Sequence, residues 1–417
     1  MKTSRIPRLF SWLLVRITRG VLWRSKPGIV GITGSLGKTT TKEALVTVAK
    51  SLRRTQEAPD SLPPVDALLI SILGKKERKQ KIEELYEESK NSTWFWFSLL
   101  LRGLRLLFVA PKGGYPEVVV VEYGEASDVS MLTNIARPTV AVLTPIGDGN
   151  HESSTESLRD YARIIEQLPA SGFAVMPSDD SATKKIKQRT RAHVLTYGSK
   201  KEAHIRVMSP EQHQEKGNLA VTAKLEYGGS TVPIRLENAL GPHHATAAAA
   251  AACLGIIYGA NLIDISEALE SYKAPQGALR VIPGIKGTTL IDDAYDAHTL
   301  SVQVSLNLLE TFPGKRKIVV LGDLIDLGKY SMDAHEELGK RITKSANLLF
   351  TVGKRAKLSG DTAKRKLKKE NVFSFDEARE AGLALQNELQ EGDVILVVGS
   401  NTMGLNEVIE EVRGDLV

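Results

Sequence analysis

Short β-branched runs alternate with helical patterns along most of the chain. Pro116–Glu122, Thr139–Thr144 and Gly172–Met176 are apolar runs typical of buried strands, and Ser157–Gln167 has the spacing of a helix. Strands that alternate with helices indicate an α/β fold with a mostly parallel sheet. The alternation resumes later, where strands are predicted at Thr288–Asp292, Lys317–Asp323, Leu348–Gly353 and Asp393–Ser400.

Residues 28–43 read as a strand, a glycine-rich loop and the start of a helix. The β-branched run of Ile29, Val30 and Ile32 leads into the loop, and an Ala/Leu/Val helix pattern follows it. Glycines let the loop N–H groups turn inward, and the helix start adds its positive end, so such a loop cradles phosphates. We predict that it binds ATP through Gly34, Ser35, Leu36, Gly37, Lys38, Thr39 and Thr40.

Two residues of this loop have direct phosphate or metal chemistry. The Lys38 ammonium would reach the outer phosphates, and the Thr39 hydroxyl would ligate the Mg²⁺ that accompanies ATP. Because Ile32 occupies the position of the first glycine in the six-spaced P-loop, the loop has the shorter Gly-Ser-x-Gly-Lys-Thr-Thr form. ATP and Mg²⁺ are therefore the expected cofactors.

The 417 residues are too many for one ordinary core, and changes in the pattern divide them. Residues 55–65 read as a polar loop. Residues 190–236 hold short strand-like runs split by Gly and Lys, which predict hairpins at the edge of the first sheet. Pro275 and Gly277 interrupt the helical pattern before the second series. We predict a basic amphipathic segment at 1–25, a central P-loop-type α/β domain with a small β-hairpin extension at 26–274, and a Rossmann-like α/β domain at 275–417.

Composition and charge narrow the class of protein. A chain with 42% hydrophobic and 25% charged residues is globular rather than disordered. The single cysteine, Cys253, excludes a disulfide framework and a thiolate metal site, and it fits a reducing cytoplasm. The net charge of +6 is spread along the chain, so we interpret the basic residues mostly as solvated faces, with small anionic substrates as a secondary benefit and no nucleic-acid partner. We also expect a monomer.

Two basic segments, Arg5–Arg24 and Trp94–Arg105, are rich in aromatic and apolar residues. Both are too short or too charged to span a membrane, and no signal-peptide cleavage site follows the first. They either pack on the body of the protein or form an amphipathic patch on the inner membrane face, with Trp and Arg at headgroup level. The expected location is therefore the cytoplasm, with a peripheral membrane contact as the second reading of these segments.

Further polar residues follow predicted strands. Glu122 ends one strand, where a Mg²⁺ ligand would face the phosphates, and His151 lies in the loop after the next strand. Asp296 and His298 follow the first strand of the C-terminal domain. Each has an ordinary structural explanation, as a strand end, a loop residue or a neighbour of a helix cap. Their order suggests one site, so we expect the strands before Glu122 and His151 to be neighbours, or nearly so, of the P-loop strand.

Together these motifs resemble the Mur ligase superfamily over about residues 26–417. The resemblance implies an ATP-dependent amide ligase of peptidoglycan precursor synthesis, nearest to the branch that adds D-alanyl-D-alanine to a UDP-N-acetylmuramoyl tripeptide. In this chemistry the substrate carboxylate attacks the γ-phosphate, and the incoming amine displaces the resulting acyl phosphate. The matching motifs beyond the P-loop are Gly241–Ala248, Ile291–His298, Val320–Gly328, Ala334–Gly339 and Val398–Ser400.

The resemblance also implies roles for single residues. Lys38, Glu122 and His151 would be catalytic, and Thr39, Glu122 and His151 would hold the metal. Asp296 and His298 would contribute to nucleotide binding when the C-terminal domain closes over ATP. The partners would be a small-molecule cell-wall precursor and a dipeptide or amino-acid amine.

The chain departs from the family pattern at several positions. Only about 25 residues precede the P-loop strand, where the family has a domain for the uridine nucleotide. Ser157–Gln167 holds no lysine, and Tyr161 or a neighbour takes the place of the family's carbamylated lysine. Ala247 and Ala278 stand where an adenine-contacting Asn and a hinge Arg are expected. Two alternatives stay open: a ligase with another acceptor, in wall-lipid amidation or polyglutamylation, and a nucleotide-binding paralogue without ligase activity.

Overall fold

The structure is a computed structural model that describes residues 8–59, 62–74, 79–90, 92–111, 114–123, 126–146, 155–215, 218–295, 297, 299–325, 327 and 330–414. The chain divides into two compact units. The first comprises Met1–Pro210, Thr222–Arg235 and Ala245–Tyr272, and the second comprises Glu211–Val221, Leu236–His244 and Lys273–Val417. The domain limits predicted from the sequence stay a prediction.

The larger sheet contains the strands β1 (Gly28–Thr33), β2 (Thr55–Glu57), β3 (Val118–Glu122), β4 (Val140–Leu143), β5 (Phe173–Pro177), β6 (His193–Gly198), β7 (Ile205–Glu215), β8 (Asn218–Tyr227) and β9 (Ser230–Glu237). Within the described residues their order is β2-β3-β1-β4-β5-β6-β7-β8-β9. All neighbours from β2 to β7 pair in parallel. The predicted α/β fold with a mostly parallel sheet is therefore confirmed.

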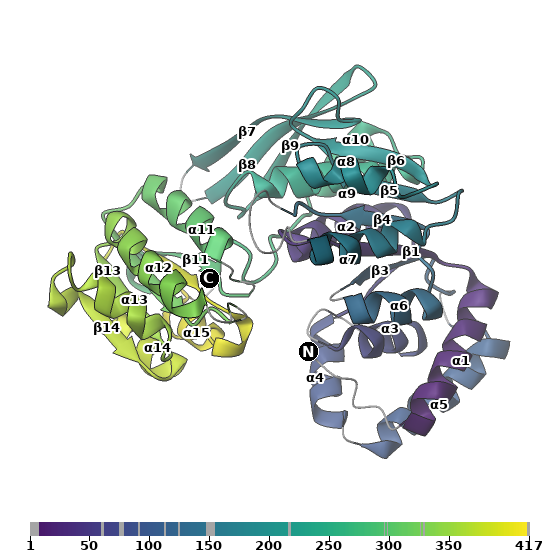
Figure 1. Cartoon of the computed structure of the whole chain (residues 1–417), viewed down its shortest axis with the longest axis horizontal. Helices are drawn as coiled ribbons and strands as arrows, with labels where there is room; N and C mark the ends of the chain where they lie inside the picture. Colours follow the sequence, from purple (N-terminus) through teal and green to yellow (C-terminus); the bar gives the residue numbers. More distant parts are fainter. Residues whose placement is uncertain are drawn as a thin grey trace. The chain divides into compact units, whose positions relative to one another are not determined.

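Helices accompany this sheet, and α2 and α7 pack against β1 (Figure 1). The apolar side of α2 is buried through Ala44, Leu45 and Val48, and α3 is buried along almost its whole length. These helices are α1 (Arg8–Ser25), α2 (Lys38–Leu52), α3 (Pro64–Leu73), α4 (Lys79–Ser89), α5 (Thr93–Phe108), α6 (Ala126–Ile135), α7 (Thr155–Glu166), α8 (Ser181–Lys187), α9 (His243–Ile257) and α10 (Leu262–Leu269).

Two parts of this sheet differ from the sequence-based prediction. Residues 55–65 were expected to form a loop, but Thr55–Glu57 is strand β2 and pairs with β3. Residues 190–236 were expected to form hairpins at the edge. β7, β8 and β9 are consecutive neighbours at the end of the sheet, but β6 pairs in parallel with β5 and thereby extends the main sheet. The short polar strand β2 has no local signal, whereas β6 was expected as a strand and only its pairing partner was missed. In both cases the neighbouring strands of the sheet decide the outcome.

The second unit has its own sheet, with β10 (Arg280–Pro283), β11 (Thr289–Asp293), β12 (Arg316–Gly322), β13 (Leu348–Val352), β14 (Val372–Phe375) and β15 (Asp393–Val398). Its order is β10-β11-β15-β12-β13-β14, and every pair except β10 with β11 is parallel. Its helices are α11 (Thr299–Thr311), α12 (Ser331–Ser345), α13 (Ala356–Ala363), α14 (Ala378–Glu388) and α15 (Asn406–Val412).

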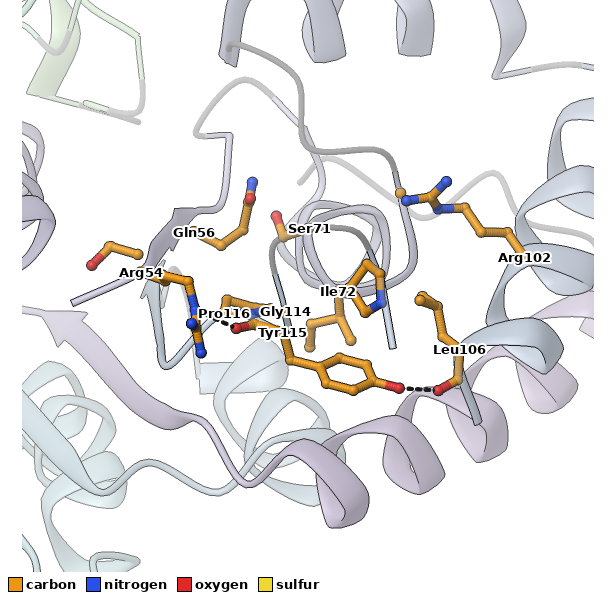
Figure 2. A pocket seen from close by; sticks show the side chains of 12 residues that line it. Arg54, Gln56, Ser71, Ile72, Arg102, Leu106, Gly114, Tyr115 and Pro116 are labelled. Atoms are coloured by element: carbon orange, nitrogen blue, oxygen red, sulfur yellow. Dashed lines mark hydrogen bonds between the residues drawn. The ribbon is translucent and has the colours of Figure 1, made fainter. Parts of the chain in front are cut away.

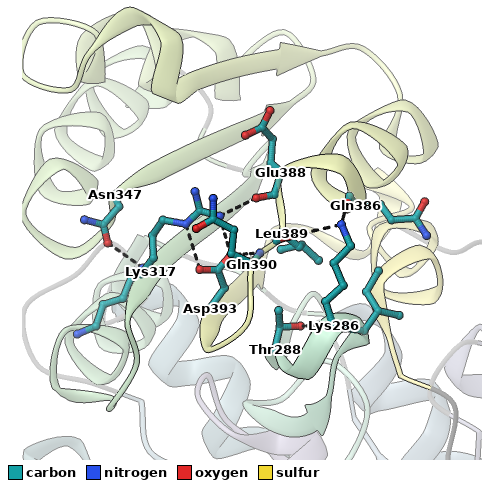
Figure 3. Close-up of polar contacts among 11 residues, drawn as sticks. Lys286, Thr288, Lys317, Asn347, Gln386, Glu388, Leu389, Gln390 and Asp393 are labelled. Carbon is teal, nitrogen blue, oxygen red and sulfur yellow. Dashed lines mark hydrogen bonds and ion pairs between the residues drawn. The ribbon is translucent and has the colours of Figure 1, made fainter.

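Polar contacts join the amino ends of β12 and β15 (Figure 3). The Arg316 guanidinium donates from Nε and Nη2 to the two oxygens of Asp393, at 3.0 and 2.7 Å. The Asp393 side chain is only 1% exposed, and it also accepts from the Gln390 N–H at 2.8 Å. Arg316 further donates to the Glu388 carbonyl at 2.6 Å. A nearly buried carboxylate is therefore neutralised where the two strands begin.

Among the described residues, no helix is both long enough and apolar enough to cross a bilayer.

Candidate active site

The strand that leads into the P-loop lies between the two strands expected beside it. β1 pairs with β3, where Ile32 is opposite Glu122, and with β4, where Thr33 is opposite Leu143. Hydrogen bonds continue past the strand ends, because the Tyr123 N–H donates to the Ile32 carbonyl at 2.8 Å. The prediction that the strands before Glu122 and His151 neighbour the P-loop strand is confirmed. The three loops therefore leave the same edge of the sheet.

Glycines shape the loop that follows β1. Gly34 has φ +129° and Gly37 has φ +72°, both in the region that favours glycine. Gly37 is the N-cap residue of α2, and no side chain caps this helix. The first N–H groups of an α-helix have no intrahelical acceptor, so here they are available to an anion. The backbone of Gly34–Lys38 therefore has the features of a phosphate cradle.

Gly34 also packs tightly against the loop after β4. A Cβ atom added to Gly34 would lie 2.7 Å from the Thr144 carbonyl oxygen and 2.9 Å from its nitrogen. Next along the loop, the Leu36 N–H donates to the Pro145 carbonyl at 2.8 Å. The Thr144 hydroxyl is buried and has no hydrogen-bond partner within the part of the chain that the structure describes. The P-loop is thus held against the segment that leads toward His151.

The functional side chains of the loop lie close to this backbone. Lys38 is half-buried, and its ammonium donates to the Ser35 carbonyl at 3.1 Å, so the positive charge sits over the loop. Thr39 is half-buried at the first turn of α2, whereas Thr40 is buried. Glu122 is half-buried at the end of β3, beside Ile32.

Asp180, which follows strand β5, holds the start of the segment after β4 through a hydrogen bond. Its carboxylate oxygen Oδ2 accepts from the Ile146 N–H at 2.6 Å, and its side chain is buried. Asp180 lies in the turn after β5, which is the next strand beyond β4 in the sheet. It therefore acts as a positioning residue for the segment Thr144–Ile146.

Lys42 is a buried cation that the sequence interpretation missed. It lies one helical turn after Lys38 and is only 1% exposed. Its ammonium donates to the Ala58 carbonyl and lies 3.8 Å from a carboxylate oxygen of Glu57. The contact anchors the amino-terminal end of α2 to β2. A lysine on the apolar side of the helical pattern was the available signal, since a buried lysine needs a partner.

Three predicted site residues, His151, Asp296 and His298, lie outside the described residues. Within the described ranges, no group of three or more His, Cys, Asp or Glu side chains could hold a metal ion. Tyr161, in the helix where the family pattern has a lysine, is half-buried and packs against the core of the first unit. The metal ligands therefore stay a prediction from the sequence.

The segment that leads to Asp296 is anchored within the second unit by Asp292. Its carboxylate accepts from the Gly277 N–H at 2.8 Å and from the Ala294 N–H at 3.3 Å. Burial raises the pKa of Asp292, while these two hydrogen bonds and the Arg280 charge act in the opposite direction. The strand β11 and the turn around Gly277 are thus held together by one nearly buried carboxyl group.

Comparison with known proteins places this architecture in a family. A sequence model of the Mur ligase middle domain matches residues 32–255, which include the P-loop, Glu122 and His151. The Mur ligase glutamate ligase domain matches residues 279–401. The chain belongs to the Mur ligase family. The family comprises ATP-dependent ligases, so the resemblance inferred from the motifs is confirmed.

Individual relatives match nearly the whole chain. The UDP-N-acetylmuramoyl-tripeptide--D-alanyl-D-alanine ligase of Bacillus subtilis is 24% identical over 405 residues, which are 95% of this chain and 78% of the relative. The MurF ligase of Thermotoga maritima, solved in complex with ADP, has a TM-score of 0.72 and 23% identity. The match covers 96% of this chain and 83% of the MurF chain. MurF from Acinetobacter baumannii has a TM-score of 0.75 and 20% identity, and the match covers 96% of this chain and 80% of that MurF chain. These solved structures share the fold of the Mur ligase described here.

Proposed function

We propose that this Mur ligase joins D-alanyl-D-alanine to a UDP-N-acetylmuramoyl tripeptide at the expense of ATP. The geometry that carries the proposal is the loop Gly34–Thr40, which lies between the strand of Glu122 and the segment that starts at Thr144. Phosphoryl transfer needs a phosphate cradle with positive charge and a carboxylate for Mg²⁺ at one place. The relatives that match almost the whole chain are named for this reaction.

In the proposed reaction, a carboxylate oxygen of the tripeptide attacks the γ-phosphorus of ATP. The bond from that phosphorus to the β–γ bridging oxygen breaks, and ADP leaves with the electron pair. The dipeptide amine then attacks the acyl carbon, loses a proton and expels phosphate, which gives the amide. Lys38 and the free N–H groups at the start of α2 would bind the phosphates and offset the negative charge that builds up.

The side chains beside the cradle fit Mg²⁺. A hydroxyl and a carboxylate are hard oxygen ligands, and Thr39 and Glu122 offer them on adjacent elements of one sheet edge. His151, which follows the segment Thr144–Ile146 in the sequence, would complete the set. When bound, Mg²⁺ neutralises phosphate charge and orients the γ-phosphate toward the attacking carboxylate.

The test of function uses the full chain with Mg²⁺-ATP, the UDP-linked tripeptide and D-alanyl-D-alanine. We expect one phosphate released for each amide formed, with the product identified by mass spectrometry. Phosphate release that is independent of the dipeptide, or an amide formed only with another amine, would contradict the proposed substrate. ADP binding without any ligation under these conditions would point to a paralogue that has lost the reaction.

Lys38→Ala tests the nucleotide site. The variant removes the cation of the phosphate cradle, so we expect turnover to fall by about 100-fold or more and ATP affinity to weaken. Lys50→Ala is the matched control, because Lys50 is on the same helix with its side chain 56% exposed. Unchanged ATP affinity and turnover in Lys38→Ala would remove the loop from the site.

Asp296→Asn and His298→Gln test the contribution of the C-terminal unit. We expect both variants to bind ADP with near-normal affinity and to lose amide formation, because these residues would act only once the second unit closes over ATP. A weak ATPase without amide product is also expected, since an unprotected acyl phosphate hydrolyses. Normal ligation by both variants would exclude these residues from the reaction.

A further inference from the structure

Two parallel helices, α1 and α5, form one side of the first unit and lie side by side in Figure 1. Glycines let them approach closely. A Cβ on Gly103 would lie 2.6 Å from Ile17, and one on Gly20 would lie 2.7 Å from Leu107. Both helices also contact α3, which is buried along almost its whole length. The helix pair therefore covers the core with one side and leaves its opposite side exposed.

The exposed side of α5 is apolar along its whole length. Trp94, Phe97, Leu101, Leu104 and Phe108 follow one another at spacings of three or four residues, which places them on one face of the helix. Trp94 and Phe108 are 72% and 77% exposed, and the other three are 37% to 49% exposed. The opposite face of the helix is buried, including Trp96. A soluble surface rarely leaves such a continuous stripe uncovered.

The exposed side of α1 carries two tryptophans and two arginines. Trp12, Arg16, Arg19 and Trp23 recur at helical spacing on one face, and the Arg16 guanidinium lies 5.0 Å from the centre of the Trp12 ring. Trp12 is 58% exposed and Trp23 is 79% exposed. Three of the four tryptophans in the chain are therefore exposed on this helix pair.

The charge on the two helices has a single sign. Their sequences contain six arginines and no aspartate or glutamate. Arg16, Arg24 and Arg105 are exposed, and Arg24 donates to the Phe108 carbonyl at 3.4 Å, which joins the ends of the two helices. An apolar, tryptophan-rich surface without a single acidic side chain is complementary to an anionic surface that has an apolar interior.

A basic pocket borders α5 at the amino edge of the sheet (Figure 2). It is lined by Arg54, Arg102, Leu106 and Tyr115, among others. Arg102 donates to the Leu73 carbonyl at 2.7 Å, and Arg54 donates to the Tyr115 carbonyl at 3.2 Å. Arg54 is also paired with Glu117 at 3.7 Å, so among the described residues the unpaired positive charge beside the pocket comes from α5.

We propose that the exposed faces of α1 and α5 dock on the surface of an anionic lipid bilayer. Tryptophan and arginine are the residues that favour the headgroup level, where an indole ring is partly buried and a guanidinium meets phosphate. The apolar stripe of α5 would enter the boundary of the acyl chains. The ends of these helices lie near the amino edge of the sheet, because α1 ends three residues before β1 begins. The P-loop leaves the opposite edge, so docking leaves the proposed nucleotide site open.

The test measures binding of the full chain to vesicles by co-sedimentation. Vesicles of phosphatidylcholine with about 30 mol% phosphatidylglycerol are compared with phosphatidylcholine alone, at about 0.1 M and 0.5 M salt. We expect binding to the anionic vesicles at low salt, and at least about tenfold weaker binding to neutral vesicles or at high salt. Tryptophan emission should shift to the blue on binding, because three exposed indoles enter a less polar layer.

Two sets of variants locate the contact. Trp23→Ser combined with Phe108→Ser should weaken binding by about tenfold or more, because each removes a large exposed apolar side chain. Ile263→Ser combined with Met332→Ser is the matched control, since these side chains are 61% and 62% exposed on other elements, and it should bind normally. Arg16→Gln combined with Arg105→Gln should reduce the salt dependence. Circular dichroism and thermal melting verify that each variant is folded.

Three results would overturn the proposal. One is no binding of the folded wild-type chain to anionic vesicles. Another is unchanged binding after the paired Trp23 and Phe108 substitutions. The third is a dimer in solution that these substitutions dissociate, without vesicle binding, which would assign the surface to a second copy of the chain. Ligase activity measured without lipid tests the proposed function separately, because none of these side chains lies in the proposed site.

Discussion

Gly34 packs so closely against Thr144 that adding a single Cβ atom at residue 34 would disturb the shape of the P-loop. We expect Gly34→Ala to weaken ADP binding by about tenfold or more, which is about 1.4 kcal/mol. Its Cβ would meet the Thr144 backbone at 2.7 to 2.9 Å, and φ +129° disfavours any side chain. Isothermal titration calorimetry with ADP measures the effect.

Gly228→Ala is the matched control for this glycine. Gly228 also has a positive φ, +57°, but a Cβ there meets nothing within 4 Å. The substitution should cost about 1 kcal/mol of stability from the backbone alone and leave ADP affinity unchanged. Equal ADP affinity in Gly34→Ala and Gly228→Ala would show that the tight contact with Thr144 does not shape the site.

His335 is expected to make the free energy of unfolding of the second unit depend on pH. It is buried, its Nε2 accepts from the Leu324 N–H at 3.2 Å, and its Nδ1 lies 2.7 Å from the Ser331 carbonyl. The neutral ring with the proton on Nδ1 satisfies both contacts. Burial lowers the pKa of His335 below the usual 6.5, and Arg355 acts in the same direction against the Ser331 hydrogen bond and Asp323.

This lowered pKa predicts a loss of stability in acid. Below about pH 6.5 the unfolded chain takes up a proton at His335 that the folded chain does not, so the free energy of unfolding falls by up to about 1.4 kcal/mol per pH unit. Urea unfolding of the wild type and His335→Gln at pH 8 and pH 5.5 measures it. The wild type should lose more stability between these two pH values than the variant. Parallel pH profiles would contradict the prediction.

At the scale of the element, the ion pair between Arg316 and Asp393 fixes how β12 and β15 begin. The two residues are opposite each other in the parallel register. Arg316→Leu would leave a carboxylate whose side chain is 1% exposed without its cation. We expect a loss of about 3 kcal/mol of stability, because an uncompensated buried charge is costly.

Chemical denaturation of Arg316→Leu measures this loss, and Lys340→Ala serves as its control. Lys340 pairs with Glu337 on the surface of α12, where both side chains are more than half exposed. Such exposed ion pairs contribute little to the free energy of unfolding, so the control should unfold at the same denaturant concentration as the wild type. Similar stability in both variants would mean that the pair at β12 and β15 is not needed to start the sheet.

At the scale of the whole molecule, two units with separate cores predict two thermal transitions. We expect calorimetry of the full chain to resolve them. Arg316→Leu should lower the transition of the second unit only. ADP should raise the transition of the first unit, which holds the P-loop, and Lys38→Ala should abolish that rise. A single transition that shifts as a whole in Arg316→Leu would contradict independent units.

The sequence by itself determined the features that local chemistry controls. β-branched runs predicted the buried strands, and the glycines and Lys38 predicted the phosphate-binding loop, because strand propensity and positive φ depend on few residues. The motif order indicated the Mur ligase family, which the family comparison confirmed. The roles of His151, Asp296 and His298 stay predictions, since these residues lie outside the described ranges.

Only the tertiary structure decided which distant groups meet. Strand β2 forms because β3 offers a partner, and Lys42 is buried because Glu57 and Ala58 surround its ammonium. The packing of α1 and α5 on α3 determines which tryptophans are buried and which are exposed. The helical periodicity of either segment alone does not predict this. These outcomes depend on contacts between residues far apart in the chain, so a local sequence pattern cannot predict them.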